Sequence, residues 1–297
     1  MANRNLVKLT LDNLEILGYS VGGEETVIAL PGLDVCFDIG KAPEDILTIN
    51  HILLTHGHMD HAAGIAYYFS QRDFREMTPG TILISKHLAP ALERLLDCWG
   101  GLDGSRPPAQ IISMQPGEEY ELRRNLFAFA FETNHSLGSL GYTIIERRQK
   151  LKDEYLDLPG PEIARLRQSG VPVTYTLNLP LVTYLGDTRE GDFEKLACVR
   201  QSRILIAECT FFQHDHHERA RAGRHYHFDQ LARLLPQMEN EFILLTHLSR
   251  RTELAWARKR VQEELPEELS RRIVFLMDRA LHRANARKSI PPDSPSE

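Results

Sequence analysis

The sequence has no long apolar run and no recognisable leader. None of its 297 residues lies in a stretch approaching the ~20 consecutive apolar positions that a membrane-spanning helix needs. The residues from Met1 to Lys8 lack the apolar core and the small-residue cleavage site of a secretory signal. These absences predict a soluble, cytoplasmic protein with no membrane partner.

Cysteine is scarce, and an excess of basic charge is missing. The four cysteines are isolated in the sequence, which favours reduced thiols in a cytoplasmic protein over disulfides. The net charge of −6 and the pI near 6.1 do not indicate a nucleic-acid-binding domain, which is usually basic. Basic residues nevertheless gather at 147–152 and at 250–251. We expect Lys150, Lys152 and Arg250 among them to contact substrate phosphates.

What the chain does contain is a concentrated set of metal-ligand side chains. His56, His58, Asp60 and His61 lie within six residues, directly after the apolar stretch 52–54. An apolar, β-branched stretch followed by a glycine-bearing turn is typical of a strand that ends in a loop. Side chains alternate along extended chain, so those at 56, 58 and 60 project in similar directions. Imidazole and carboxylate are good ligands for zinc and related ions, so this run predicts a metal site.

This run resembles the H-x-H-x-D-H motif of the metallo-β-lactamase fold, and three later positions complete the resemblance. His135 follows the apolar run 126–131, Asp187 follows 181–184, and His247 follows 242–246. Each stands where a strand is predicted to pass into a loop. The resemblance implies an α/β (α+β) protein built as a four-layer αββα sandwich, with the ligands at one edge between two sheets.

The resemblance also implies two metal ions. The first would be held by His56, His58 and His135, and the second by Asp60, His61 and His247, with Asp187 bridging them. Two ions ~3.5–4 Å apart lower the pKa of bound water from about 15.7 toward about 7 and offset the charge of an attacked phosphate. We expect zinc, although manganese and iron suit the same ligands.

Two carboxylates have further implied roles beside the metals. Asp60 is expected to orient or deprotonate the attacking water. Asp38, in the segment 37–40, matches the first motif of the fold. It is expected to accept a hydrogen bond from a ligand histidine and so fix its ring.

The C-terminal half is similar to ribonuclease Z, the endonuclease that trims the 3′ end of precursor tRNA. The Thr-His-x-Ser signature of that family appears at 246–249 and its Glu-x-Thr-Phe element at 208–211. A further family histidine matches His225, and the presence of His227 two residues on resembles the short plant-type enzymes. The resemblance also suggests a homodimer.

Leaving-group chemistry gives a physical reason for a Glu–His pair. Breaking a P–O3′ bond expels an alkoxide, which needs a proton as it departs. A histidine kept basic by a carboxylate supplies that proton, typically with a gain of ~10²–10⁴-fold. The resemblance gives this role to Glu208 with His225, and the sequence separates His225 only weakly from His227.

One departure from the family concerns a tRNA-gripping arm. The well-known bacterial short form carries a long arm between the third-motif histidine and the bridging aspartate, whereas the stretch from His135 to Asp187 is short. Residues 147–180 therefore form either a reduced, basic arm or an ordinary strand–helix connection. In the first case, the phosphate contacts would be Lys150, Lys152, Arg165 and Arg167.

Strand and helix patterns alternate along the chain. Strands are predicted over 6–11, 14–21, 26–29, 35–39, 81–85, 109–113, 126–132, 141–147, 173–177, 181–185, 203–207, 242–246 and 272–277, and helices over 62–76, 87–99, 162–168, 192–199, 226–238 and 250–264. The ligands come from both halves of the chain, so we expect a single domain over 1–288. The proline- and serine-rich segment 289–297 is predicted to be a disordered tail.

We therefore predict a metal-dependent phosphodiesterase of the ribonuclease Z type that matures the 3′ end of precursor tRNA. The short arm and the acidic pI also fit a hydrolase of small molecules such as cyclic nucleotides, thioesters or lactones. A third hypothesis is a non-catalytic RNA-binding protein on the same fold, and the intact ligand set argues against it.

Overall fold

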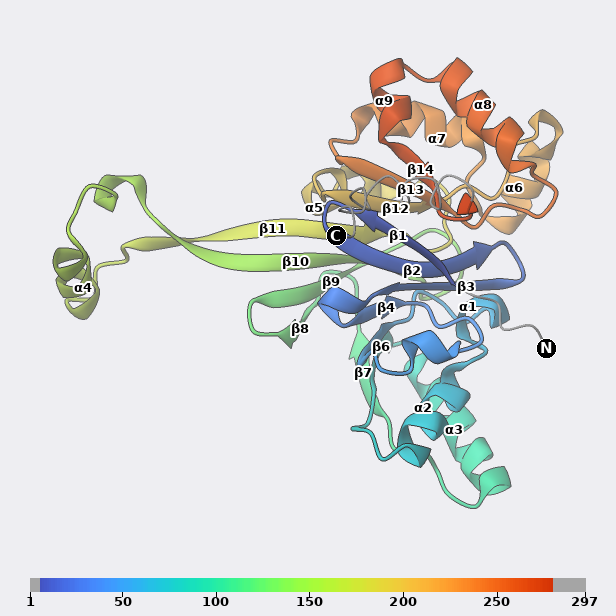
Figure 1. Cartoon of the computed structure of the whole chain (residues 1–297). Helices are drawn as coiled ribbons and strands as arrows, with labels where there is room; N and C mark the ends of the chain where they lie inside the picture. The colour runs from blue at the N-terminus through green and yellow to red at the C-terminus, as the bar shows by residue number, and fades with distance from the viewer. Residues whose placement is uncertain (1–5, 280–297) are drawn as a thin grey trace, which may run out of the picture.

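The computed structural model describes residues 6–279, and the predicted tail at 289–297 lies outside the described residues. Two seven-stranded sheets form the centre of the molecule (Figure 1). The first contains, in spatial order, β1 (Val7–Leu11), β2 (Leu14–Val21), β3 (Glu25–Leu30), β4 (Val35–Phe37), β5 (His51–Leu53), β6 (Thr81–Ser85) and β7 (Gln110–Met114). The second contains, also in spatial order, β14 (Ile273–Phe275), β13 (Phe242–Thr246), β12 (Ile204–Glu208), β11 (Thr174–Tyr184), β10 (Leu140–Leu151), β9 (Leu126–Glu132) and β8 (Glu119–Arg123).

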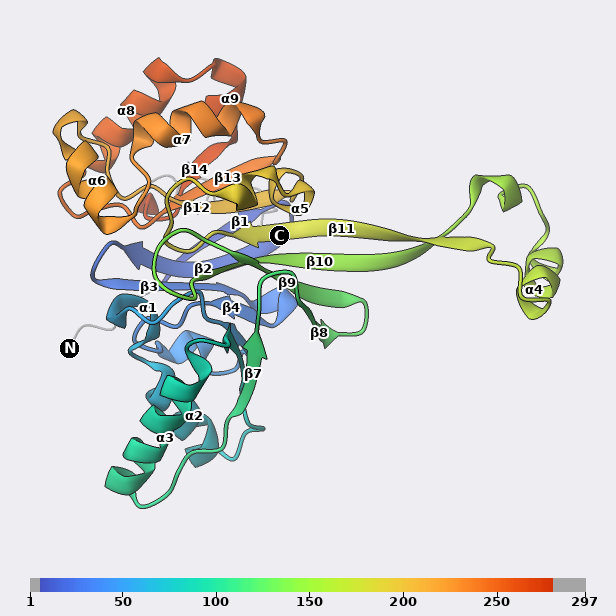
Figure 2. The ribbon, with the colours of Figure 1, turned by 180° about the vertical axis from the view of Figure 1, so that it is seen from behind.

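Helices cover the outer face of each sheet. Those after the first sheet's strands are α1 (Met59–Ala62), α2 (Ile65–Phe74) and α3 (Ala89–Asp103). Those that cover the second sheet are α5 (Ala197–Arg200), α6 (His217–Gly223), α7 (Phe228–Leu234), α8 (Leu254–Glu264) and α9 (Glu267–Arg272). Helix α4 (Gly160–Gln168) covers neither sheet and lies at the far end of β10 and β11. The layers lie in the order helix, sheet, sheet, helix (Figure 2), which confirms the αββα expectation. None of the helices within 6–279 has the length and apolar character needed to span a bilayer.

Three apolar cores hold the four layers together. Ile28, Phe37 and Tyr142 belong to a core between the two sheets, where side chains of both inner faces interdigitate. A second core packs α7 and α8 onto β12 and β13, and a third packs α2 and α3 onto β5 and β6. The core between the sheets therefore fixes them relative to each other. It also fixes the strand ends at which the candidate site lies.

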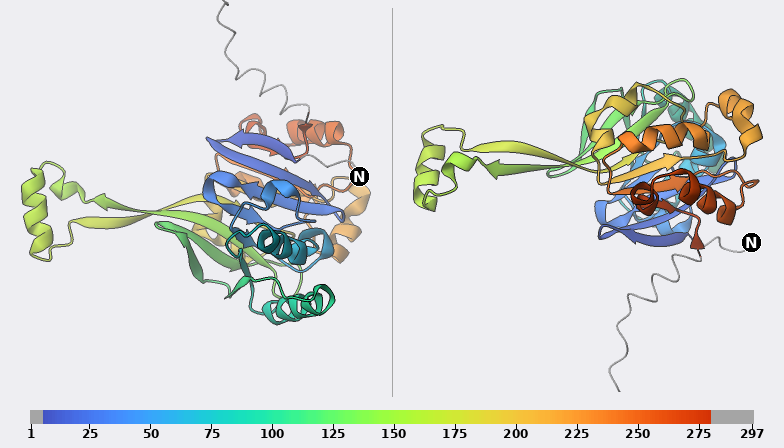
Figure 3. Two further views of the ribbon diagram at one scale, coloured as in Figure 1. Left: turned by 60° about the horizontal axis from the view of Figure 1, so that its bottom comes forward. Right: turned by 90° about the horizontal axis from the view of Figure 1, so that it is seen from above.

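The outer parts of β10 and β11 and the chain between them form an arm that leaves the body of the protein, beyond the last pairing of β10 with β9 at Glu146. Strands β10 and β11 pair antiparallel from Tyr142 and Tyr184 out to Leu151 and Thr174, and they carry α4 at the far end (Figures 1 and 3). The structure thus shows a projecting arm rather than an ordinary strand–helix connection. The prediction of separate strands at 173–177 and 181–185 is wrong, because β11 continues through Pro180.

Other element predictions differ mainly at their ends. The predicted helix 226–238 is shorter, since α7 gives way to a 3₁₀ turn at Leu235. The predicted helix 250–264 begins only at Leu254. The predicted helix 192–199 is a 3₁₀ turn over 192–195 followed by α5. Strand β8, whose five residues are mostly charged, was not predicted.

Candidate metal centre

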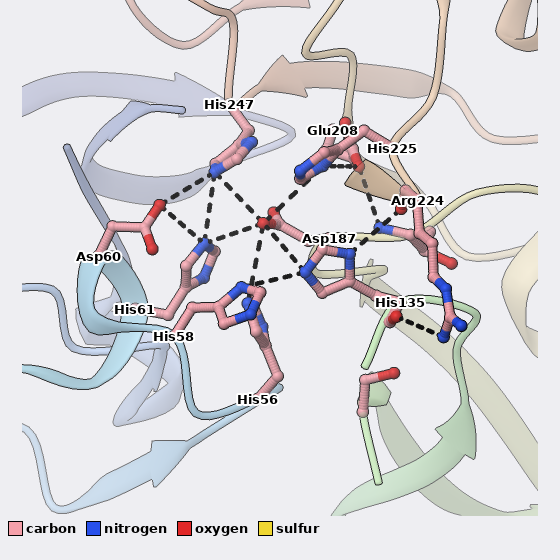
Figure 4. Close-up of polar contacts among 12 residues, drawn as sticks. His56, His58, Asp60, His61, His135, Asp187, Glu208, Arg224, His225 and His247 are labelled. Atoms are coloured by element: carbon pink, nitrogen blue, oxygen red, sulfur yellow. Dashed lines mark hydrogen bonds and ion pairs between the residues drawn. The ribbon is translucent and has the colours of Figure 1, made fainter. Parts of the chain in front are cut away.

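The candidate ligands lie where strands end. His56 and Asp38 follow the parallel strands β5 and β4 in the first sheet, and Asp187 and His247 follow β11 and β13 in the second. The carboxyl ends of parallel strands meet at one edge of a sheet, so these side chains converge from both sheets on one point. Figure 4 shows this convergence around the Asp187 carboxylate.

One group of possible ligands comprises His56, His58, His135 and Asp187, whose ligating atoms all lie within 4.8 Å of one another. His135 Nε2 lies 3.1 Å from His58 Nδ1. Asp187 Oδ2 lies 3.8 Å from His56 Nε2 and 3.9 Å from His135 Nε2. These four residues fit the first metal as the sequence predicts it.

The second group comprises Asp60, His61 and His247. His61 Nε2 lies 3.4 Å from His247 Nε2, and Asp60 Oδ2 lies 3.4 Å from the same His247 nitrogen. Asp187 Oδ2 is 3.3 Å from both imidazoles. The Asp187 carboxylate therefore faces both groups, as a bridging ligand would.

Two buried atoms support the fit of a metal at this place. His56 Nε2 and Asp187 Oδ1 are buried and have no hydrogen-bond partner among the described residues. An unpaired buried polar atom is costly and is uncommon without a ligand to satisfy it. Burial and the neighbouring His61 ring hold the pKa of His56 well below its usual value, so this ring keeps the neutral form that binds metals.

The outer nitrogens of the ligand rings are held by the protein. The partners of these Nδ1 atoms are Thr55 Oγ1 for His56, Asp38 Oδ2 for His61, the Arg224 carbonyl for His135 and Thr210 Oγ1 for His247. A donated Nδ1–H fixes the tautomer and leaves the Nε2 lone pair directed at the metal position. The chain thus prepares four Nε2 ligands before any ion binds.

Asp38 has the surroundings expected of a residue that orients a ligand. Its fully buried carboxylate lies 2.7 Å from His61 Nδ1 and accepts hydrogen bonds from the Tyr184 hydroxyl at 2.9 Å and the Thr55 amide at 2.8 Å. Asp38 adopts φ = 52°, and His247 adopts φ = 58°. Left-handed backbone is strained for both residue types and is often found at functional sites.

Sequence reasoning missed two residues that support the ligands. Thr210 donates its hydroxyl to Glu208 at 2.6 Å and also contacts His247. Arg224 holds His135 from both ends, since its carbonyl faces the His135 ring and its guanidinium donates to the His135 carbonyl at 3.0 Å. Thr210 lies inside the quoted 208–211 element, which is the signal that could have found it, whereas nothing in the sequence marks Arg224.

The Glu208–His225 pair lies beside the predicted metal ligands. His225 Nδ1 is 2.7 Å from Glu208 Oε1 and 3.9 Å from Asp187 Oδ2. The buried Glu208 carboxylate also accepts hydrogen bonds from the Thr188 and Thr210 amides. Burial of the His225 ring opposes protonation, but the charge of Glu208 prevails and raises the pKa of His225 to about 9. The Glu208 carboxylate therefore favours the protonated form of His225.

His227 faces away from this centre. Its ring is fully buried, with Nε2 2.9 Å from the Gln213 carbonyl and Nδ1 accepting from the Asp229 amide at the start of α7. The geometry therefore separates the two candidate proton donors that the sequence left open, because only His225 contacts Glu208.

The three candidate phosphate-binding residues lie in two separate places. Lys150 and Lys152 stand on the arm, and no ion pair within the described chain engages them. Arg250 is exposed beside the site, and its Nη2 donates to Glu24 Oε2 at 2.7 Å. A phosphate contact by Arg250 would thus have to compete with Glu24.

Comparisons with known proteins find relatives that belong to one superfamily. A model of the beta-lactamase superfamily domain matches residues 34–248. A tRNase Z of Arabidopsis thaliana is 34% identical over 247 residues, which cover 82% of this chain and 88% of the relative. A nuclear ribonuclease Z of Triticum aestivum is 39% identical over 170 residues, or 57% of this chain and 97% of the relative. The solved metallo-beta-lactamase fold protein YhfI of Bacillus subtilis aligns with a TM-score of 0.58 and 16% identity, covering 92% of this chain and 96% of that one. The last likeness concerns the fold alone.

Proposed function

Because the chain belongs to the ribonuclease Z family of the beta-lactamase superfamily, we propose that it is an endoribonuclease that cleaves precursor tRNA after the discriminator nucleotide. The observation that carries this proposal is the Glu208–His225 pair, 2.7 Å apart, set against a complete ligand cluster. Hydrolysis of activated small molecules needs the metals, whereas expulsion of a ribose alkoxide also needs an acid beside them.

We propose zinc as the metal, in two positions. His56, His58 and His135 would hold one ion, Asp60, His61 and His247 the other, and Asp187 would bridge them. Bound there, the ions supply a hydroxide near neutral pH and offset the charge that builds on the attacked phosphate. Manganese and iron accept the same ligands, so the metal content of the purified protein decides its identity.

The protein's own groups orient the nucleophile and protonate the leaving group. Asp60 Oδ2 is fixed by the Gly23 amide at 3.0 Å and orients the attacking hydroxide by accepting its hydrogen bond. The hydroxide oxygen bonds to phosphorus as the P–O3′ bond breaks. The O3′ alkoxide takes the proton of His225, whose Nδ1 remains bonded to Glu208. The products are a tRNA with a 3′-hydroxyl and a trailer with a 5′-phosphate.

Substrate binding is proposed for the arm and for Arg250. Lys150, Lys152, Arg165 and Arg167 are basic residues of the arm without an ion pair in the described chain, and the arm holds them away from the body (Figure 3). Phosphate contacts of this kind position an RNA without reading its sequence. Cleavage of a 3′-extended precursor tRNA at one site, by zinc-loaded protein, is the experiment that tests this function.

Two further assignments complete the proposal. We propose a homodimer, supported by exposed apolar side chains on α2 and α3, among them Tyr67, Phe74, Trp99 and Leu102.

We also propose a cytoplasmic location, supported by four cysteines that are all free. Imaging of a tagged chain in its own cells tests the second assignment.

A further inference from the structure

Two loops beside the metal centre carry the proposed proton donor and its carboxylate. The Glu208 loop, residues 208–213, starts at the end of β12, and the His225 loop, residues 224–227, joins α6 to α7. The two backbones pair in parallel at Phe211 and His227. The 2.7 Å contact between the carboxylate and the imidazole therefore depends on how these two loops are held together.

Arg260, on α8, reaches both loops with one guanidinium. Its Nη1 donates to the carbonyl of Phe212 in the Glu208 loop. Its Nη2 donates to the carboxylate of Asp229, which lies in the first turn of α7, just after the His225 loop. The Arg260 side chain is only 4% exposed, so water competes little for these contacts. One side chain thus joins the Glu208 loop to the end of the His225 loop.

The surroundings of Arg260 hold its guanidinium in one orientation. Its Cζ lies 4.8 Å from the centre of the Phe228 ring, which stacks on Phe212 with ring centres 4.9 Å apart. Glu264 accepts a hydrogen bond from Nε at 2.6 Å and, with Asp229, balances the buried charge. Arginine presents its donors in a rigid planar fork, whereas lysine presents a point charge on a flexible stem. Two acceptors on separate loops therefore suit an arginine and not a lysine.

The contacts of Arg260 concern the acid rather than the metal ligands. Among residues 6–279, no hydrogen bond or ion pair joins Arg260 to any of the seven predicted ligands. The Glu208 loop instead contacts the acid directly, since the Phe211 and His225 ring centres are 6.1 Å apart. A displacement of ~1 Å in a catalytic group can cost about 10²-fold in rate. Holding the two loops together is therefore a contribution to catalysis that leaves the metals in place.

We infer that Arg260 is a positioning residue that keeps the Glu208 loop and the His225 loop in the register at which His225 meets Glu208. The inference rests on the proposed function, because it takes His225 as the proton donor. Arg260 acts through the two loops and not on the reacting atoms. Its loss should slow the departure of leaving groups that need a proton and spare those that leave without one.

A leaving-group comparison tests this inference. p-Nitrophenolate departs without a proton, whereas the more basic phenolate gains from a general acid. The rates of the zinc-loaded full chain are measured with bis(p-nitrophenyl) phosphate and with diphenyl phosphate, for wild type, Arg260→Lys and Arg258→Lys. Arg258 lies on the same helix and pairs with Asp278 at 2.7 Å, so it is the matched control. We expect the ratio of the first rate to the second to rise by ~10²-fold in Arg260→Lys and to keep its wild-type value in Arg258→Lys.

Two further variants make the outcome decisive. Asp229→Ala removes the same link from its other end, so it should raise the ratio too, and it replaces Arg260→Lys if that variant does not fold. A wild-type ratio in the folded variant, or an equal loss with both substrates, would overturn the inference. His225→Ala is measured beside them and should raise the ratio at least as much. An unchanged ratio in His225→Ala would instead remove the proposed proton donor, so failure of the proposed function is distinguished from failure at Arg260.

Discussion

At the residue scale, His225 combines a raised pKa with a position beside Asp187. Replacing it by alanine removes the proposed proton donor and leaves all seven predicted metal ligands in place. We expect RNA cleavage by His225→Ala to fall by ~10²–10⁴-fold, with the zinc content unchanged. His214→Ala is the control. Full cleavage activity in a zinc-loaded His225→Ala protein would show that another group protonates the leaving oxygen.

The pH dependence of cleavage tests the partner of His225. The acid form of His225 is present below its pKa of about 9 and is lost as the pH rises through that value. Cleavage should therefore decline above about pH 9. In Glu208→Gln the carboxylate charge is gone, so the declining limb should move toward the ~6.5 of an unperturbed histidine. A limb that stays in place in Glu208→Gln would separate Glu208 from the proton donor.

Asp38 should control metal affinity without touching the metal. Its carboxylate bonds to His61 Nδ1, the Tyr184 hydroxyl and Thr55. Loss of such an outer partner typically weakens metal binding by ~10–100-fold. We expect a loss of this size for Asp38→Asn in zinc titrations with a competing chelator. Unchanged affinity would mean that the His61 ring is held sufficiently by packing.

At the element scale, deletion of the arm tests RNA binding separately from phosphodiester hydrolysis. Joining Arg148 to Leu177 through an Asn-Gly turn removes residues 149–176 at a point where the two strands are paired. This variant should hydrolyse a small chromogenic phosphodiester at the wild-type rate but lose its low KM for precursor tRNA. Equal KM values for precursor tRNA with and without the arm would remove the arm from substrate binding.

The charges of the arm allow a finer test. In the double variant Lys150→Ala/Lys152→Ala, each lost phosphate contact should reduce the salt dependence of RNA binding by a slope of roughly one. Lys259→Ala is the control, because Lys259 is an exposed lysine on α8 paired with Glu263. A salt dependence identical to that of the control would assign RNA binding to other residues.

The arm also shows where prediction from the sequence stops. The local pattern of residues 141–147 and 173–185 indicates strands, but it does not say that they pair with each other and extend into solvent. Pro180 argues against a continuous strand, and it is tolerated in β11 because it lies at a register shift opposite Ile145. Whether a hairpin projects is decided by the absence of packing partners, which local sequence does not record.

The candidate site was more predictable than the arm. Its ligands are chemically distinctive residues at strand ends, so their types and positions mark them without any knowledge of contacts. The supporting contacts are different, since they join residues far apart in the chain, as when Arg224 bonds to His135 or Tyr184 to Asp38. Such contacts depend on how the two sheets pack, and arginine or tyrosine at those positions has no local signature.

At the scale of the whole molecule, the proposed homodimer makes a prediction about α2 and α3. Trp99 is 48% and Leu102 is 77% exposed on that face. A charge there should prevent a second copy from packing against it, so Trp99→Glu should be monomeric by sedimentation velocity at a concentration where wild type is dimeric. Arg94→Glu, at an exposed position of α3 outside these apolar residues, controls for added negative charge. A dimer that persists in Trp99→Glu would place the interface elsewhere.

The central claim is that this chain combines a two-metal cluster with a proton donor, His225, that serves the leaving 3′ oxygen of an RNA substrate. The most direct measurement is incubation of the zinc-loaded protein with a 3′-extended precursor tRNA at low salt, beside Asp60→Ala. We predict a single cut after the discriminator nucleotide that leaves a 3′-hydroxyl and is absent in Asp60→Ala. An uncut precursor, with zinc bound and a small phosphodiester still hydrolysed, would contradict the claim and indicate a small-molecule phosphodiesterase.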